Sequence, residues 1–296
     1  MTQIHQKTKD IDMAKKLIKV AIAYDFDGTL APGNMQEHAF LPSLGIDPKT
    51  FWTNTKKKAK ENDMDEILAY MQITLDEARI KNLPIRKLDF VNYGKGIQFF
   101  EGVETYFERI NAYAKKKDIV IEHYIISSGL REFIKGTKIA KYFKNIFASG
   151  FEYDANGVAV WPALAINYTN KTQYLFRINK GINNSYDNYE INKFMPEKER
   201  YIPFEQMIYV GDGETDVPAM KMIKYQGGKA IAVYNPKIRA KKSRKSPKQI
   251  CEDLISQNRA NYIAPANYSE GSELDKMIKL IIDKIHAEIE LKKYIK

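Results

Sequence analysis

The segment that decides the fold is Ala23-Tyr24-Asp25-Phe26-Asp27-Gly28-Thr29-Leu30. It continues an apolar run over residues 17–23 whose length and composition predict a buried strand. Because side chains alternate along an extended chain, we expect both aspartates on one face and Phe26 in the core. Gly28 lets a ligand approach the backbone. Open α/β sheets bind ligands at strand ends of this kind, although the segment alone also fits an ordinary acidic turn.

Strand and helix patterns alternate along the chain from residue 99 onward. The strands are predicted near residues 119–127, 143–149, 207–210, 229–234 and 262–264. Residues 151–161 predict a β-hairpin around Asn156-Gly157, and the polar residues 181–205 predict a long surface loop. Strands that alternate with helices favour an α/β fold with a doubly wound parallel sheet.

A helical insertion interrupts this pattern after the first strand. Residues 32–98 show helical spacing without a strand pattern, and glycines lie at both junctions. We therefore expect an α/β core domain made of residues 1–31 and 99–296, and a helical cap domain made of residues 32–98. Glycine-containing junctions are suited to a hinged lid.

Composition excludes several classes of protein. The 296 residues contain 47 Lys and Arg against 37 Asp and Glu, a net charge of +10, with the densest basic patch at residues 237–248. Lysines scattered along helical segments favour a solvated surface that attracts small anions, so we expect no nucleic-acid partner.

Residues 1–15 predict a polar lead rather than a secretory signal, and no apolar run approaches the ~20 residues that span a bilayer. The lone Cys251 excludes an internal disulfide; we expect a packed thiol and a cytoplasmic protein without a membrane partner. The oligomeric state stays open.

Two further segments each place a polar side chain near the end of a predicted strand or the start of a predicted helix. An apolar strand is predicted to end at Ser127-Ser128-Gly129, where a following helix would present free N–H groups to an anion. An ordinary helix N-cap is the alternative. Lys171 is expected one turn into a helix, and Lys180 is the fallback candidate.

The fourth segment is Tyr209-Val210-Gly211-Asp212-Gly213-Glu214-Thr215-Asp216. An apolar strand again ends in paired carboxylates among glycines. Two acidic strand ends, separated in the sequence by a strand-terminal serine and a lysine, indicate one functional site rather than two unrelated turns.

Together the four segments resemble the haloacid dehalogenase superfamily of phosphotransferases. The match is Asp-x-Asp-Gly-Thr, a strand-terminal Ser, a helix-borne Lys and Gly-Asp-x-x-x-Asp, in that order, over most of residues 17–235. The hairpin and the helical insertion look like the phosphoserine-phosphatase-like branch and its cap. The resemblance implies a Rossmann-like core and a Mg²⁺-dependent phosphatase that acts on a small phosphorylated metabolite.

Phosphoryl transfer needs an in-line nucleophile, a proton for the leaving oxygen and neutralisation of charge. The resemblance assigns Asp25 as the nucleophile that forms an aspartyl phosphate, and Asp27 as general acid and base. It places Mg²⁺ on Asp25, Asp212 and the backbone carbonyl of Asp27, with Asp216 orienting the waters of the ion or Lys171. Four crowded carboxylates also repel one another unless cations lie among them, which independently favours a metal.

The same resemblance places the phosphoryl oxygens on Ser127, Lys171 and the backbone N–H groups near Gly28 and Ser128. The acid at Asp27 argues against dehalogenation, because a halide leaves without a proton.

The cap entry departs from the pattern of phosphoserine phosphatases. Those enzymes carry a glutamate nine residues after the nucleophile, where it meets the amine of the substrate; this chain has Asn34. This departure argues against phosphoserine, and Asn34, Glu37 and His38 become the candidate specificity residues. His123 lies within a predicted strand and is expected to pack against a helix rather than act in catalysis.

Two alternatives remain. A phosphomutase or another phosphotransferase of the same superfamily would use the same four segments, and the sequence does not separate it from a hydrolase. A receiver-type phosphorylatable binding module also uses strand-terminal Asp, Ser or Thr, and Lys. Receivers are shorter, lack the inserted cap and have no second acid two residues after the first.

Overall fold

The computed structural model describes residues 17–83, 85–240 and 245–294. The polar lead predicted over residues 1–15 lies outside this range, as do residues 241–244 of the basic segment. Among the helices of the described residues, none combines the length and the apolar character that crossing a bilayer demands.

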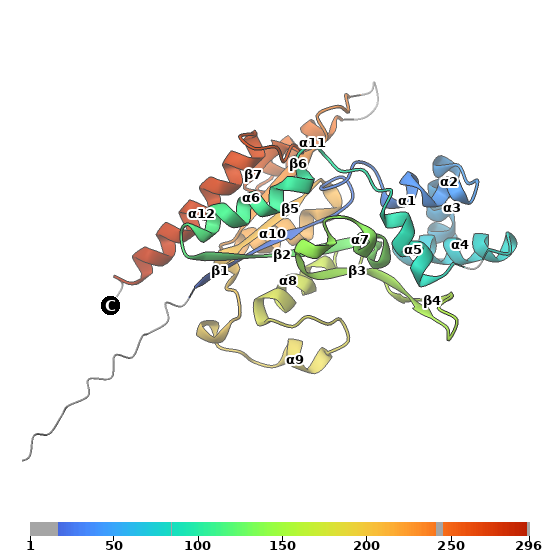
Figure 1. Ribbon diagram of the computed structural model, residues 1–296, viewed down its shortest axis with the longest axis horizontal. Coiled ribbons are helices and arrows are strands. Elements are labelled where there is room, and N and C mark those ends of the chain that lie inside the picture. The colour runs from blue at the N-terminus through green and yellow to red at the C-terminus, as the bar shows by residue number, and fades with distance from the viewer. Residues whose placement is uncertain (1–16, 84, 241–244, 295–296) are drawn as a thin grey trace, which may run out of the picture.

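A seven-stranded sheet with the order β4-β3-β2-β1-β5-β6-β7 forms the centre of the fold (Figure 1). Its strands are β1 (Ile18–Tyr24), β2 (Ile119–Leu130), β3 (Phe143–Tyr153), β4 (Ala159–Leu164), β5 (Met207–Gly211), β6 (Lys229–Tyr234) and β7 (Tyr262–Pro265). Neighbouring strands are parallel except for the antiparallel pair β3–β4. The predicted doubly wound sheet is confirmed. The strand order reverses at β1, so the carboxyl ends of β1 and β5 form the switch point where such sheets bind ligands.

Helices cover both faces of the sheet. They are α6 (Val103–Lys115) and α12 (Glu273–Lys292) on one face, and α8 (Lys171–Lys180), α10 (Val217–Tyr225) and α11 (Pro247–Ser256) on the other. The alternation along β1 divides the core: Val20, Ile22 and Tyr24 pack on the first side, and Ala21 and Ala23 on the second. This two-faced burial explains why β1 is apolar at every position from Val20 to Ala23.

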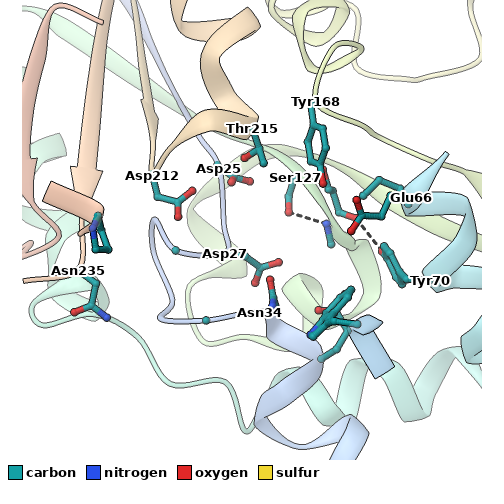
Figure 2. A pocket seen from close by; sticks show the side chains of 18 of the residues that line it. Asp25, Asp27, Asn34, Glu66, Tyr70, Ser127, Tyr168, Asp212, Thr215 and Asn235 are labelled. Carbon is teal, nitrogen blue, oxygen red and sulfur yellow. Dashed lines mark hydrogen bonds between the residues drawn. The ribbon is translucent and has the colours of Figure 1, made fainter. Parts of the chain in front are cut away.

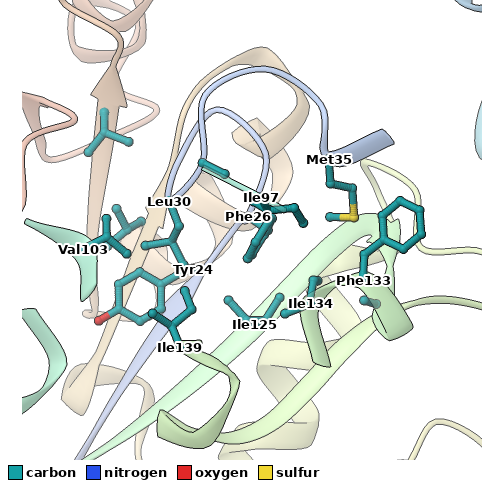
Figure 3. Packing of buried hydrophobic residues seen from close by; sticks show 14 of the residues in the cluster. Tyr24, Phe26, Leu30, Met35, Ile97, Val103, Ile125, Phe133, Ile134 and Ile139 are labelled. Atoms are coloured by element: carbon teal, nitrogen blue, oxygen red, sulfur yellow. The ribbon is translucent and has the colours of Figure 1, made fainter. Parts of the chain in front are cut away.

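Phe26 anchors the loop that carries the two aspartates. Its side chain is fully buried, and Figure 3 shows it in the apolar cluster with Ile97 and Ile125. Burial of such a ring contributes about 1.5–3 kcal/mol. The prediction that Phe26 enters the core is confirmed, and the carboxylates on either side of it face the pocket described below.

Residues 32–98 form five helices among the described residues. These are α1 (Met35–His38), α2 (Phe40–Ser43), α3 (Pro48–Glu61), α4 (Glu66–Ile80) and α5 (Lys87–Gly94). Asp47 caps α3 by accepting from the Thr50 N–H, and Asp65 caps α4. The segment contains no strand in its described part, as predicted; a single bridge joins Arg86 to Val158 beside the hairpin.

Two predicted boundaries were wrong. Strand β2 does not end at Ser127 but continues to Leu130, which pairs with Ser149 of β3, and the following helix α7 (Arg131–Gly136) has only six residues. No long helix therefore begins directly after Ser127. The predicted strand 143–149 and the first arm of the hairpin are one strand, β3, whose pairing with β4 confirms the hairpin itself.

Helix α5 packs against α7 through two glycines. A Cβ on Gly94 would lie 1.9 Å from the Phe133 carbonyl oxygen, and one on Gly136 would lie 1.8 Å from that of Val91. The two backbones touch where any side chain would hold them apart. Gly94, one of the glycines at the second junction of the insertion, is thus the last residue of a helix fixed to the core, and Gly96 lies in the connection that follows.

Residues 181–205 are mostly irregular, as predicted, but they contain α9 (Asn188–Asn192). The buried Arg177 guanidinium holds this segment by donating to the backbone carbonyls of Asn184, Ser185 and Asp187. Cys251 is a packed thiol, since its Sγ lies 3.5 Å from the Val233 carbonyl and burial raises its pKa to about 12.

Candidate active site

The four segments singled out in the sequence meet at the switch point of the sheet. The Asp25 N–H donates to the Val210 carbonyl, which continues the β1–β5 pairing up to the first carboxylate. Figure 2 shows Asp25, Asp27, Ser127 and Asp212 around one pocket, whose volume is about 540 Å³. This volume suits a small ligand.

Lys171 joins two of the carboxylates. Its Nζ lies 2.7 Å from Asp216 Oδ1 and 3.1 Å from Asp25 Oδ1, and its side chain is 1% exposed. Although burial opposes the charge, these carboxylates outweigh it and raise the pKa of Lys171. Lys171 is the first residue of α8 rather than one turn into it. The fallback Lys180 instead donates to the backbone carbonyls of Ile191 and Lys193.

Asp216 has its acceptors occupied by protein donors. Its Oδ1 accepts from Lys171 and from the Tyr209 hydroxyl at 2.6 Å, and its Oδ2 accepts from the Asp212 N–H at 3.1 Å. A carboxylate held in this way orients its neighbours and has little freedom to bind anything else.

Asp212, in contrast, has no donor. No hydrogen bond among the described residues reaches its carboxylate, and Gly28 lies directly against it, since a Cβ there would be 2.0 Å from Oδ2. Gly28 also has a φ of +74°, which glycine adopts without strain. Burial, and then the charges of Asp216 and Asp25, raise the pKa of Asp212 well above its usual range.

The pKa values of Asp25 and Asp27 are also raised. Burial raises the pKa of Asp25 to about 7 against the opposing effect of Lys171. Burial and the Asp25 charge raise that of Asp27 well above its ordinary value, and Asp27 Oδ1 accepts from the Met35 N–H at 2.8 Å. A carboxyl group that keeps its proton near neutral pH can act as a general acid.

The donor set fits a hard cation. One oxygen each of Asp25, Asp212 and Asp216 lies within 4.8 Å of the others; because protein donors already occupy Asp216, the carboxylates left to bind a cation are those of Asp25 and Asp212. Lys171 pairs directly with Asp25 and Asp216, whereas no ion pair within the described residues reaches Asp212. Carboxylate oxygens in this arrangement are ligands that Mg²⁺ accepts.

Two serines supply hydroxyl groups to the same pocket. Ser127 Oγ accepts from the Gly129 N–H at 3.0 Å, which leaves its own proton to donate. Ser128 Oγ is buried and has no hydrogen-bond partner in the part of the chain that the structure describes. Both residues line the pocket.

Only one of the three predicted cap-entry residues lines the pocket. Asn34 lines the pocket, and its Nδ2 donates to Glu37, which also accepts from the Trp52 indole at 2.6 Å. His38 Nε2 lies 2.9 Å from the Pro32 carbonyl oxygen. Neither Glu37 nor His38 is among the residues that line the pocket.

His123 packs in the core, as expected. Its ring nitrogens lie 3.0 Å from the Tyr24 hydroxyl and 3.0 Å from Asn111 Oδ1, between β2 and α6. Burial lowers the pKa of His123 to about 3, so the ring is neutral.

The sequence did not predict several lining residues. They are Gln36, Trp52, Glu66, Tyr70, Tyr168 and Thr215. The Tyr70 hydroxyl donates to the Ser128 carbonyl at 2.8 Å, a direct contact between α4 and the end of β2. Only Thr215 carried a signal, because it lies within the fourth segment. Tyr168 lies in the loop between β4 and α8, and the other four depend on how the insertion packs on the core.

Known proteins resemble this chain over most of its length. An uncharacterised protein of Borreliella burgdorferi is 30% identical over 284 residues, which cover 86% of this chain and 93% of that protein. Two solved structures agree in fold. A phosphoserine phosphatase with an analogue of its phospho-aspartyl intermediate has a TM-score of 0.51 at 16% identity, over 89% of this chain and 99% of that one. A protein of unknown function from Bordetella pertussis has a TM-score of 0.52 at 11% identity, over 83% and 98%.

The sequence itself matches the family of haloacid dehalogenase-like hydrolases over residues 22–221. This match spans more than half of the chain and includes all four segments that meet in the pocket. The family match therefore argues against the alternative of a receiver-type binding module. The chain is therefore an enzyme of the haloacid dehalogenase-like hydrolase family.

Proposed function

We propose that this enzyme is a Mg²⁺-dependent phosphatase that hydrolyses a small phosphate monoester through an aspartyl phosphate on Asp25. The observation that carries the proposal is the buried arrangement of Lys171 between Asp25 and Asp216, beside the carboxylate of Asp212. Membership of the hydrolase family supports it.

Asp25 is the proposed nucleophile. Its Oδ1 faces Lys171, so Oδ2 attacks phosphorus while the bond from phosphorus to the leaving oxygen breaks. Asp27 gives its proton to that oxygen, which leaves as the alcohol. Water then attacks the phosphorus of the aspartyl phosphate and gives a proton to Asp27; phosphate departs and Asp25 is regenerated.

Four groups are proposed to hold the phosphoryl oxygens. Lys171 supplies charge, Ser127 and Ser128 supply hydroxyl protons, and Gly28 lets its backbone come close to the ligand. Donors fixed in advance stabilise the charge that develops in the transition state without reorganising.

The proposed metal ligands are Asp25, Asp212 and the backbone carbonyl of Asp27. Mg²⁺ bound there would neutralise the phosphate charge and keep the two carboxylates ionised. Asp216 would stay outside the ligand set, because its oxygens already accept from Lys171, Tyr209 and the Asp212 N–H.

We further propose that residues 32–98 act as a cap domain over a core built from residues 1–31 and 99–296. Asn34, Gln36, Trp52, Glu66 and Tyr70 of this segment all line the pocket with the carboxylates. A pocket closed on this side admits small molecules and excludes bulk water, which strengthens the charge interactions inside.

Phosphate release from a panel of phosphorylated metabolites and from p-nitrophenyl phosphate tests the proposal. We expect release that requires Mg²⁺, stops with excess chelator and resumes when Mg²⁺ is restored. The Asp25→Asn variant should be folded, as judged by circular dichroism, and inactive. Undiminished release in excess chelator, or by Asp25→Asn, would contradict the proposed function.

A further inference from the structure

The insertion forms one wall of the pocket, and this wall carries an unpaired carboxylate. Glu66 is the first residue of α4 and lines the pocket beside Lys56, Trp52 and Tyr70. Within the described residues, Glu66 makes neither an ion pair nor a hydrogen bond through its side chain. The other carboxylates that line the pocket are the three assigned to the reaction, so Glu66 is available to the rest of the substrate.

A second acceptor on this wall also lacks a partner. Gln36 is 3% exposed, and its buried Oε1 accepts no hydrogen bond from any of the described residues. The amide lies beside the Tyr70 hydroxyl, which itself donates to the Ser128 carbonyl. A buried acceptor without a donor is unfavourable, so this position favours a ligand that brings an N–H or O–H group.

Aromatic rings complete this part of the pocket. Tyr168, which is 38% exposed, lies close enough to Glu66 for the carboxylate charge to act on its phenol. Trp52 packs edge-on against Tyr70 with ring centroids 5.9 Å apart, and both line the pocket. Figure 2 shows Glu66, Tyr70 and Tyr168 together on the side of the pocket away from Asp212. Aromatic faces beside a carboxylate suit a cation.

We infer that the leaving group of the substrate is a small alcohol that carries a primary ammonium group, bound by Glu66 and Gln36; this rests on the proposed phosphatase function. The ammonium charge pairs with Glu66, and an N–H group donates to Gln36 Oε1. Glu66 attracts a cationic leaving group, gives a neutral one no ion pair and repels an anionic one. A quaternary ammonium would offer Gln36 no proton. The one lysine on this wall, Lys56, is exposed and does not neutralise Glu66.

The test compares two substrates of nearly the same shape, 2-aminoethyl phosphate and n-propyl phosphate, with p-nitrophenyl phosphate as the generic substrate. We expect kcat/KM of the wild-type enzyme with Mg²⁺ to be at least about tenfold higher for the amine, a difference of ~1.4 kcal/mol. Glu66→Gln keeps the shape of the side chain and removes its charge, and it should bring this ratio close to one. Glu77→Gln on the same helix, outside the pocket lining, is the matched control and should keep the wild-type ratio.

The outcomes separate the two proposals. Hydrolysis of p-nitrophenyl phosphate without a preference for the amine, or a preference that survives in Glu66→Gln, would overturn the assignment of the leaving group alone. A preference lost equally in Glu77→Gln would also overturn it. No hydrolysis of any of the three substrates would overturn the phosphatase function and this inference with it.

Discussion

Lys171 and Asp216 form an ion pair 2.7 Å long in which both side chains are almost completely buried. The same ammonium group reaches Asp25 at 3.1 Å. One cation thus fixes the proposed nucleophile, which follows β1, relative to the acidic loop that follows β5. The relative position of the two acidic strand ends therefore depends on this shared ammonium group.

Removing the Lys171 charge should destabilise the fold. We expect Lys171→Met to lower the free energy of unfolding by ~3–5 kcal/mol, because two buried carboxylates lose their shared partner. Urea denaturation at pH 7 without divalent cations measures this loss. Lys180→Met on the same helix removes a lysine that meets only backbone carbonyls, and it should cost about 0–1 kcal/mol. Equal losses would contradict the proposed role of Lys171.

Asp27→Asn should separate substrates by the basicity of their leaving groups. A basic alkoxide needs a proton in the transition state, whereas a nitrophenolate does not, so we expect kcat on alkyl phosphates to fall by about 10²–10⁴-fold. The loss on p-nitrophenyl phosphate should be much smaller. Steady-state kinetics on both substrates measures the difference, and equal losses would indicate that Asp27 only positions other groups.

The glycine contact between α5 and α7 gives a prediction about stability. Gly94→Ala places a methyl group 1.9 Å from the Phe133 carbonyl oxygen, so the helices must separate. We expect a loss of about 1–3 kcal/mol, as in overpacked cores. Gly96→Ala is the matched control, because its methyl group would meet no atom nearer than 3.6 Å. Thermal unfolding that ranks the two variants equally would contradict the contact.

His123 should contribute to the loss of stability in acid. Its pKa falls from 6.5 to about 3 on folding because the ring is buried. Between these values the unfolded chain binds a proton that the folded chain does not, so lowering the pH favours unfolding. The titratable groups that face the ring are the phenols of Tyr24 on β1 and Tyr106 on α6.

We therefore expect His123→Gln to be less stable than the wild type at pH 7. The difference between the free energies of unfolding of the two proteins should be about 2–3 kcal/mol smaller at pH 4.5, because only the wild type gains a proton at this position on unfolding. Urea denaturation at both pH values measures the gap. A gap that is independent of pH would show that His123 is protonated in the fold.

The sequence predicted the parts of the fold and site that depend on short-range pattern. Asp25, Asp27 and Asp212 follow apolar strands, and parallel strands bring such ends to one edge of a sheet. Lys171 could be chosen over Lys180 only by its place among the other segments. The pattern around Ser127 suggested a helix start, but pairing with β3 extends the strand, and such pairing leaves no local signal.

The pocket wall formed by residues 32–98 could not be predicted, because it depends on tertiary packing. Tyr70 and Glu66 lie on a helix whose spacing indicates one buried face, yet spacing does not say which part of that face meets the pocket. Of the three residues chosen from the sequence, Asn34, Glu37 and His38, only Asn34 lines the pocket, and Gln36 lines it as well. Gly94 lies at a junction whose glycines suggested a hinge, whereas in the structure it allows α5 to pack closely against α7.

In the proposed reaction, Asp25 carries the phosphoryl group during turnover. The most direct measurement quenches the wild-type enzyme in acid during steady-state hydrolysis, reduces it with borohydride and identifies the modified peptide by mass spectrometry. Borohydride converts an aspartyl phosphate to homoserine, so we predict homoserine at position 25 only when substrate and Mg²⁺ are both present. Phosphate release without any modification at position 25, or modification at another residue, would contradict the account.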